Sequence, residues 1–229
     1  MKSSGRGVLY LVWGEKIEPV LQRSIASLKA IHPELPIEIA RLDAPENSAQ
    51  SLMEKTEMFE RSPFDETLYL DADTIVMGRL DFAFEMARQF GLACCICEAP
   101  FARRYAGLAD RGDMVEYNCG VLFFTTRAKP VFDAWREIAL SLDSSLLHFA
   151  GGRKAVMPWN DQAGFAAAVA KCGISPFVLP RNWNFRAYIE HEFYGPLKIW
   201  HAYPDPPASV IEIGKYYGSP GAILQHHKL

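Results

Sequence analysis

The sequence lacks the features that mark membrane, secreted and nucleic-acid-binding proteins. Nowhere do apolar residues continue for about 20 positions, the length that a membrane-spanning helix needs, and the apolar run at residues 8–13 is too short for a secretory signal. The formal net charge is -3 and no run of Lys and Arg occurs, so the chain offers no basic surface for a phosphate backbone. We therefore expect a cytoplasmic protein with no transmembrane segment and no nucleic-acid partner.

Cysteine is also scarce, and its placement argues against a zinc site. The chain has five cysteines, an odd number, without the paired Cys and His spacing of a zinc finger. Cys94, Cys95 and Cys97 occur together in one apolar stretch. Because a free cysteine behaves as a small apolar residue, we interpret these residues as the buried part of a strand.

What the chain does contain is the composition of an ordinary globular protein. Hydrophobic residues make up 49% and charged residues 22% of the chain, far from the composition of disordered proteins. A length of 229 residues suits one α/β domain with a large core. We therefore predict a single domain over residues 1–229.

Strand and helix patterns alternate along the first third of the chain. Residues 8–13, 36–42 and 67–70 are apolar and extended in pattern, and helical patterns at residues 19–31 and 48–61 separate them. This β-α-β-α-β order predicts the α/β class, with a mainly parallel mixed sheet and helices on both faces. Farther along we predict helices at 81–89, 130–142 and 161–172, strands at 91–97, 119–125, 176–179 and 197–201, and an irregular segment at 98–117.

Two carboxylates follow the third predicted strand, in the segment Asp71-Ala72-Asp73. Residues two apart in a strand point to the same side, and ligands of parallel sheets gather at the carboxyl ends of the strands. Converging carboxylates suit Mg²⁺ or Mn²⁺, which keep coordination positions for substrate phosphates. The pattern alone leaves a second interpretation open, in which both side chains are solvated and only cap a turn.

Further segments follow the order and spacing of a known family. They are Lys55, SPFD at 62–65, LYLDADTIV at 68–76, YNCGVLFF at 117–124, NDQ at 160–162 and IWH at 199–201. With them the chain resembles, over most of its length, the metal-dependent glycosyltransferases with a DxD motif and the Rossmann-like GT-A fold, particularly family 8. The resemblance implies a nucleotide-sugar-binding half at about 1–117 and a sugar and acceptor half at about 118–229.

The resemblance also implies an activity and a set of site residues. The enzyme would move a hexose-type sugar from a nucleotide-diphosphate donor, usually a UDP-sugar, to an acceptor hydroxyl with retention; the acceptor, a glycan, a lipid-linked molecule or a protein, is not identified. Asp71, Asp73 and His201 would bind Mn²⁺ or Mg²⁺, and Asp161 and Gln162 would be catalytic. If the enzyme instead inverts the configuration of the sugar, Asp161 would be the general base. The donor would contact Val12, Trp13, Gly14, Lys55, Asp71, Ala72, Asp73, Asn118, Gly120, Asp161 and Gln162.

The sequence departs from the family in two places. Cys119 occupies a position where a small residue such as Ala is usual. After His201, residues 202–207 read AYPDPP, whereas family members often carry a Gly and a phosphate-binding Lys there. The diphosphate contact on that side is therefore left without an assigned residue. Trp183, Phe185 and Tyr188 suit either an acceptor platform or ordinary packing.

Two other functions compete with this interpretation. Asp71 could be the nucleophile of an aspartyl-phosphate-type phosphohydrolase, with residues 112–116 (GDMVE) as its acidic metal motif. Such enzymes usually carry their nucleophile on the first strand, whereas two βα units precede Asp71. A catalytically silent protein that only binds nucleotide sugars is the other alternative, because a fold does not imply a function.

Overall fold

A computed structural model describes residues 3–98, 115–150 and 152–229 of the chain. The first units are β1 (Ser3–Trp13), α1 (Glu18–Ile31), β2 (Ile37–Leu42), α2 (Ser48–Thr56), α3 (Met58–Arg61) and β3 (Phe64–Leu70). The strand β1 pairs in parallel with both β2 and β3, so the predicted β-α-β-α-β unit is confirmed. The prediction of a single helix at 48–61 is wrong, because the segment forms two helices. They are divided by a tight turn in which Glu57 N–H donates to the Glu54 carbonyl at 3.2 Å.

The central sheet has six strands in the order β2-β1-β3-β6-β5-β9. The later strands are β5 (Leu92–Ile96), β6 (Tyr117–Thr125) and β9 (Phe177–Leu179). β6 runs antiparallel to both of its neighbours, β3 and β5, whereas β5 and β9 are parallel. The predicted mixed sheet that is mainly parallel is therefore confirmed.

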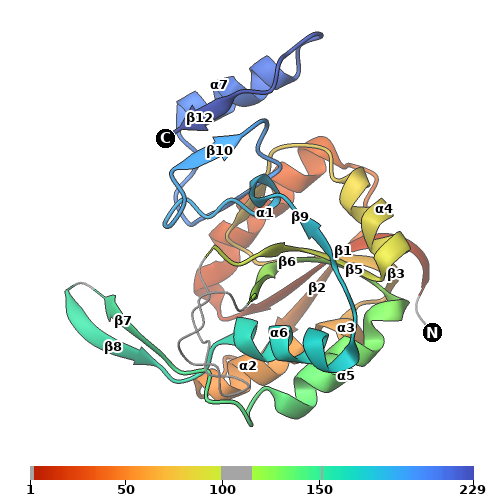
Figure 1. Cartoon of the computed structure of the whole chain (residues 1–229), viewed down its shortest axis with the longest axis vertical. Helices are drawn as coiled ribbons and strands as arrows, with labels where there is room; N and C mark the ends of the chain where they lie inside the picture. The colour runs from red at the N-terminus through yellow and green to blue at the C-terminus, as the bar shows by residue number, and fades with distance from the viewer. Residues whose placement is uncertain (1–2, 99–114, 151) are drawn as a thin grey trace.

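Helices cover both faces of this sheet (Figure 1). On one face, α1 and α4 (Asp81–Phe90) pack against side chains that include Val8 and Tyr10. On the other face, α2, α3, α5 (Lys129–Ile138) and α6 (Asp161–Cys172) pack against side chains that include Leu9. Successive β1 residues thus enter different cores, as the alternation of side chains along a strand requires.

The cysteines predicted to be buried are buried. Cys94 and Cys95 lie in β5, Cys97 follows it, and none of these cysteines forms a disulfide with a described residue. Burial raises the pKa of the Cys94 thiol, so it stays protonated at neutral pH. These residues are core, as interpreted.

Several small elements lie outside the central sheet. The strand β4 (Thr74–Val76) pairs antiparallel with β11 (Ile199–His201), β7 (Leu146–Ala150) with β8 (Arg153–Met157), and β10 (Glu192–Tyr194) with β12 (His226–Lys228). The sequence patterns gave no sign of the β7–β8 and β10–β12 pairs or of α7 (Ala208–Tyr217). Short 3-10 helices complete the described elements: η1 (Glu15–Ile17), η3 (Thr126–Ala128) and η4 (Arg181–Trp183).

Two predictions fall largely outside the described residues. Of the irregular segment at 98–117, residues 99–114 are not described, and Tyr117 already belongs to β6. The proposed phosphohydrolase motif at 112–116 lies mostly in the same segment. Within the ranges given above, no helix is long and apolar enough to cross a bilayer.

Candidate active site

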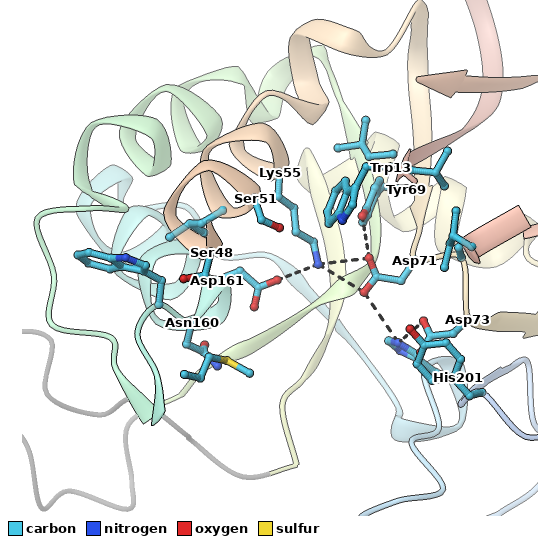
Figure 2. A pocket seen from close by; sticks show the side chains of 18 residues that line it. Trp13, Ser48, Ser51, Lys55, Tyr69, Asp71, Asp73, Asn160, Asp161 and His201 are labelled. Atoms are coloured by element: carbon cyan, nitrogen blue, oxygen red, sulfur yellow. Dashed lines mark hydrogen bonds and ion pairs between the residues drawn. The ribbon is translucent and has the colours of Figure 1, made fainter. Parts of the chain in front are cut away.

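A cavity of about 510 Å³ opens at the carboxyl ends of β1 and β3 (Figure 2). Its walls come from segments far apart in the sequence: the ends of β1 and β3, one side of α2, the start of α6 and the end of β11. Most residues predicted from the sequence line it, namely Val12, Trp13, Lys55, Asp71, Ala72, Asp73, Asp161 and His201. This is the edge of the sheet at which ligands of α/β proteins bind.

Asp71, Asp73 and His201 converge on one side of the cavity. The two aspartates occupy the turn between β3 and β4, where Asp71 N–H donates to the Gly120 carbonyl at 2.8 Å. The β4–β11 pairing sets His201 opposite Thr74 and so brings the imidazole to this turn. His201 Nε2 lies 3.3 Å from Asp73 Oδ1 and 3.8 Å from Asp71 Oδ2.

This cluster fits a divalent cation. One ligand atom from each residue can be chosen so that all lie within 4.8 Å of one another. Two carboxylates and an imidazole form a mixed oxygen and nitrogen donor set that leaves positions for phosphate oxygens. Burial raises the pKa of Asp73, but the hydrogen bond and charge of His201 outweigh it and lower that pKa, so Asp73 is ionised at neutral pH.

Lys55 forms the second charged group of the cavity, on the other side of Asp71 (Figure 2). Its Nζ lies 2.8 Å from Asp161 Oδ2 and 3.2 Å from Asp71 Oδ1, and only 14% of its side chain is exposed. Burial lowers the Lys55 pKa, but the carboxylates of Asp161 and Asp71 outweigh it, so that the pKa is well above its ordinary value. Lys55 is not a solvated surface lysine.

The start of α6 separates the two residues predicted to be catalytic. Asn160 caps the helix, because its Oδ1 accepts a hydrogen bond from the Gln162 N–H at 2.9 Å. Asp161 then faces the cavity. Burial raises the pKa of its carboxyl, but the charge and the hydrogen bond of Lys55 together outweigh burial, so the pKa is lowered. Gln162 is buried and does not line the cavity. Among the described residues, its Oε1 has no hydrogen-bond partner.

Asn118 and Gly120 are buried in β6 and also lie behind the cavity wall. Asn118 Oδ1 accepts a hydrogen bond from Gly120 N–H at 2.9 Å, so the amide oxygen is occupied by its own strand. A Cβ at position 120 would stand 2.4 Å from His201 Cε1 and 2.5 Å from Asp71 Oδ2. Glycine is therefore needed here because the side chains of His201 and Asp71 pack directly on the backbone.

The turn after β1 also borders a second hollow. Val12 and Trp13 line both this hollow, of about 470 Å³, and the main cavity. Gly14 lines only the second one, with Glu18 and Arg41 opposite. Gly14 has a φ of 73°, a conformation that glycine adopts without strain.

Some side chains at the site were not found from the sequence. Tyr69 OH donates to Asp71 Oδ1 at 2.7 Å. The i, i+2 spacing of these two residues on one strand could have indicated this contact. Asn184 contacts the imidazole of His201, with 2.7 Å between its Oδ1 and His201 Nδ1. No local pattern relates positions 184 and 201, because the contact depends on how residues 182–185 lie beside β11.

The segment that departs from the family after His201 is held in place by α1. Arg23 Nη2 donates to the Ala202 carbonyl at 3.1 Å, and Arg23 Nη1 lies 3.0 Å from Asp205 Oδ1. Tyr203, which is 57% exposed, lines the cavity from this segment. From this segment the cavity is therefore lined by a neutral, hydroxyl-bearing side chain on an anchored turn.

The aromatic residues considered as an acceptor platform divide into two groups. Trp183 and Phe185 are buried and belong to the packing, at 6% and 0% exposed. Tyr188 is exposed, and its hydroxyl accepts a hydrogen bond from Tyr203 N–H at 3.0 Å. Ordinary packing is therefore the correct interpretation for Trp183 and Phe185.

Solved structures with this architecture are glycosyltransferases. Mouse xyloside xylosyltransferase 1 in its apo form superimposes with a TM-score of 0.56 at 14% identity, over 89% of this chain and 100% of that one. The galactosyltransferase LgtC, in complex with donor and acceptor sugar analogs, gives a TM-score of 0.52 at 15% identity, over 91% and 95%. The chain has the GT-A fold. 

A third similar structure and the sequence comparisons complete this result. The glycosyltransferase GlyE of Streptococcus pneumoniae TIGR4 gives a TM-score of 0.53 at 15% identity, over 94% of this chain and 60% of that one. No protein-family model and no curated protein matches the sequence. At these identities the similarity establishes the fold, as predicted, and the function has to be argued from the site.

Proposed function

We propose that the protein is a metal-dependent glycosyltransferase that moves a hexose-type sugar from a nucleotide-diphosphate donor, a UDP-sugar, to an acceptor hydroxyl. The observation that carries this proposal is the Asp71–Asp73–His201 cluster on the wall of a cavity at the carboxyl ends of the strands. A GT-A fold supports it, because such folds bind nucleotide sugars at this edge. The family 8 resemblance supports UDP as the carrier.

The cavity offers a place for each part of the donor. The turn at Val12, Trp13 and Gly14 would hold the base and ribose, next to the aromatic face of Trp13. The diphosphate would lie at the carboxylates of Asp71 and Asp73, and Ala72 between them adds no bulk. The sugar would then reach Asp161, whose carboxylate is joined to that of Asp71 by Lys55.

The metal site suits Mn²⁺ or Mg²⁺, held by Asp71, Asp73 and His201. When bound, such an ion supplies a positive charge that stabilises a nucleoside-diphosphate leaving group. The protein's part is to hold the two carboxylates so that they converge. Tyr69 contributes by donating a hydrogen bond to Asp71 Oδ1 at 2.7 Å. Lys55 lies 3.2 Å from the same oxygen.

Asp161 is the residue that would orient the transferred sugar. Lys55 holds one carboxylate oxygen of Asp161, at 2.8 Å from Oδ2, and the other oxygen can accept hydrogen bonds from sugar hydroxyls. Gln162 would act behind it through its unpartnered Oε1, and with retention neither residue needs to be a strong base. Asn118 and Gly120 would support this wall from β6 rather than contact the donor through the cavity.

Release of nucleoside diphosphate tests the proposed function. A panel of nucleotide sugars is incubated with the protein and simple sugar acceptors, in Mn²⁺ or in EDTA. We expect turnover of one donor class that requires metal, and its loss in Asp73→Asn and Asp161→Asn. Asp133→Asn serves as a control, because Asp133 pairs with Lys129 on the surface of α5. The anomeric configuration of the product then tests retention.

The same assay separates the alternatives. Donor that binds without any turnover would indicate a silent nucleotide-sugar-binding protein. Hydrolysis of a phosphomonoester that Asp71→Asn abolishes, without turnover of any nucleotide sugar, would support the phosphohydrolase. Either outcome would refute the transferase proposal.

A further inference from the structure

The imidazole of His201 has a buried partner on the side away from the carboxylates. Asn184 Oδ1 lies 2.7 Å from His201 Nδ1, while His201 Nε2 faces Asp73 Oδ1 at 3.3 Å. Both residues are buried, at 3% exposed for Asn184 and 8% for His201. The ring therefore has one nitrogen committed to the amide and the other directed to the carboxylates.

The backbone fixes this contact. Residues 182–185 run beside β11: Lys198 N–H donates to the Asn182 carbonyl at 2.8 Å, and Phe185 N–H donates to the Ile199 carbonyl at 3.0 Å. His201 N–H in turn donates to the Phe185 carbonyl at 2.8 Å. Asn184 is thus held between residues that are themselves bonded to the strand that carries His201.

Among the described residues, the side-chain amide of Asn184 makes no hydrogen bond other than the one with His201. Asn184 Nδ2 is buried without a hydrogen-bond partner in the part of the chain that the structure describes. An isolated buried polar atom costs free energy. On the other side of the ring, Gly120 leaves no space, since a Cβ there would stand 2.4 Å from His201 Cε1. The side chain of Asn184 therefore acts on His201.

The chemistry of the pair determines the tautomer. A carbonyl oxygen can only accept, so Asn184 Oδ1 requires the proton on His201 Nδ1. A neutral imidazole has one N–H, so in the form that binds a metal Nε2 no longer carries the proton that it shares with Asp73 and directs a lone pair to Asp71 and Asp73. With the amide reversed, its NH₂ would meet Nδ1 and the proton would lie on Nε2, where it blocks a metal. The two arrangements predict opposite tautomers.

We propose that Asn184 is a positioning residue that holds His201 in the tautomer and orientation in which Nε2 can ligate a divalent cation between Asp71 and Asp73. This inference rests on the metal site of the proposed function. Partners of this kind, behind a ligating histidine, raise metal affinity by restricting the ring and its tautomer.

The test measures Mn²⁺ binding to the intact protein in the presence of UDP, from the electron paramagnetic resonance signal of free Mn²⁺. Asn184→Leu keeps the size but removes the acceptor, and we expect affinity about 10- to 100-fold weaker. Asn184→Asp restores an acceptor and is expected to recover most of that loss. Asn182→Leu is the matched control, because its amide donates to the Pro196 carbonyl at 2.6 Å in the same loop and should leave Mn²⁺ affinity unchanged.

A variant that combines Asn184→Leu with His201→Ala distinguishes an effect of Asn184 on His201 from a general disturbance of the structure. If Asn184 acts through His201, Asn184→Leu adds no further loss of affinity in a His201→Ala background. The ¹⁵N shifts of the His201 imidazole, recorded with the diamagnetic ion Mg²⁺ and UDP present, provide a second readout: the wild-type ring should carry its proton on Nδ1, and this form should be less populated in Asn184→Leu. Melting curves confirm that each variant is folded.

The outcomes are distinct for the two proposals. Additive losses in the double variant, an Nε2–H tautomer in the wild type with Mg²⁺ and UDP present, or unchanged Mn²⁺ affinity in Asn184→Leu would overturn the role of Asn184 and leave the transferase proposal intact. A folded wild type that binds no Mn²⁺ with UDP would overturn both.

Discussion

The two sides of Asp71 differ in how their charge is balanced. On the Lys55 side, one ammonium group bridges two carboxylates, at 2.8 Å from Asp161 and 3.2 Å from Asp71. On the His201 side, an imidazole faces Asp73 and the other oxygen of Asp71, and no lysine or arginine of the described residues is within 4.0 Å of Asp73. Figure 2 shows both sides along one wall.

This difference separates a structural ion pair from a site for an ion that the protein does not supply. The Lys55 side is complete by itself, because its cation is part of the chain. On the His201 side, the carboxylates of Asp71 and Asp73 lie around an imidazole that is uncharged when it binds a metal. An added cation therefore relieves the repulsion between the two carboxylates. Mutations should therefore affect stability on one side and metal affinity on the other.

The largest effect is expected from Lys55→Met. Removing the ammonium group leaves Asp161 and Asp71 largely buried without their cation, a change that costs about 3 kcal/mol or more of the free energy of unfolding. Urea unfolding without metal measures it. Lys171→Met is the control, because Lys171 and Glu137 are both exposed and such pairs contribute about 1 kcal/mol or less. Equal losses in the two variants would show that the Lys55 side is not a buried pair.

Asp73→Asn is expected to have the opposite effects, a loss of Mn²⁺ affinity with little change in stability. It removes a ligand and a charge from the His201 side, so Mn²⁺ affinity should fall about 100-fold, the upper end of what a supporting residue alone can cost. The free energy of unfolding without metal should change little. Calorimetric titration with Mn²⁺ measures the affinity, and Lys55→Met should bind Mn²⁺ at least as well as the wild type. A large loss of stability with retained affinity would contradict this assignment.

Gly120→Ala acts on both sides at once and should have a smaller effect. Its Cβ would stand 2.4 Å from His201 Cε1 and 2.5 Å from Asp71 Oδ2, so one of these side chains must move. Overpacking of this kind costs about 1–3 kcal/mol, and Mn²⁺ affinity should fall as well. Gly214→Ala in α7, where a Cβ would meet nothing within 4 Å, is the matched control and should be neutral or stabilising.

The smallest expected effect is a change in pH dependence. Asp161 has a lowered pKa in the folded state, so its contribution to stability is present above its unfolded pKa of about 3.9 and is lost as the pH falls further. In Lys55→Met the same carboxyl is buried without its cation, and its pKa should rise. That variant should then be more stable near pH 5 than at pH 7. Unfolding at both pH values tests this, and an unchanged profile would contradict it.

Much of the fold follows from patterns within short segments. The strand ends at Asp71 and Asp73 were predicted because an apolar strand and its i, i+2 carboxylates are neighbours in the sequence. The α7 helix was missed although Val210 and Ile213 are spaced as a helix requires, because residues 204–207 read as a loop that continues. The β7–β8 hairpin was missed because the side chains of β8 are mixed in character and mostly exposed.

The candidate site was predicted less completely, since it depends on contacts between distant segments. His201 was identified only through the family resemblance, because a lone histidine after an apolar strand has no distinct pattern of its own. Gln162 and Asn118 were expected at the donor and lie behind the cavity wall. Asn184 was not singled out, because its contact with His201 arises from the way residues 182–185 lie beside β11.

Titration of UDP into the protein, followed by calorimetry in Mn²⁺ and in EDTA, tests the central claim most directly. We predict binding in Mn²⁺ that is lost in EDTA and in Asp73→Asn, but not in the surface variant Asp133→Asn. UDP that binds equally well in EDTA, or that does not bind the folded protein under any of these conditions, would contradict the metal–diphosphate site and the function built on it.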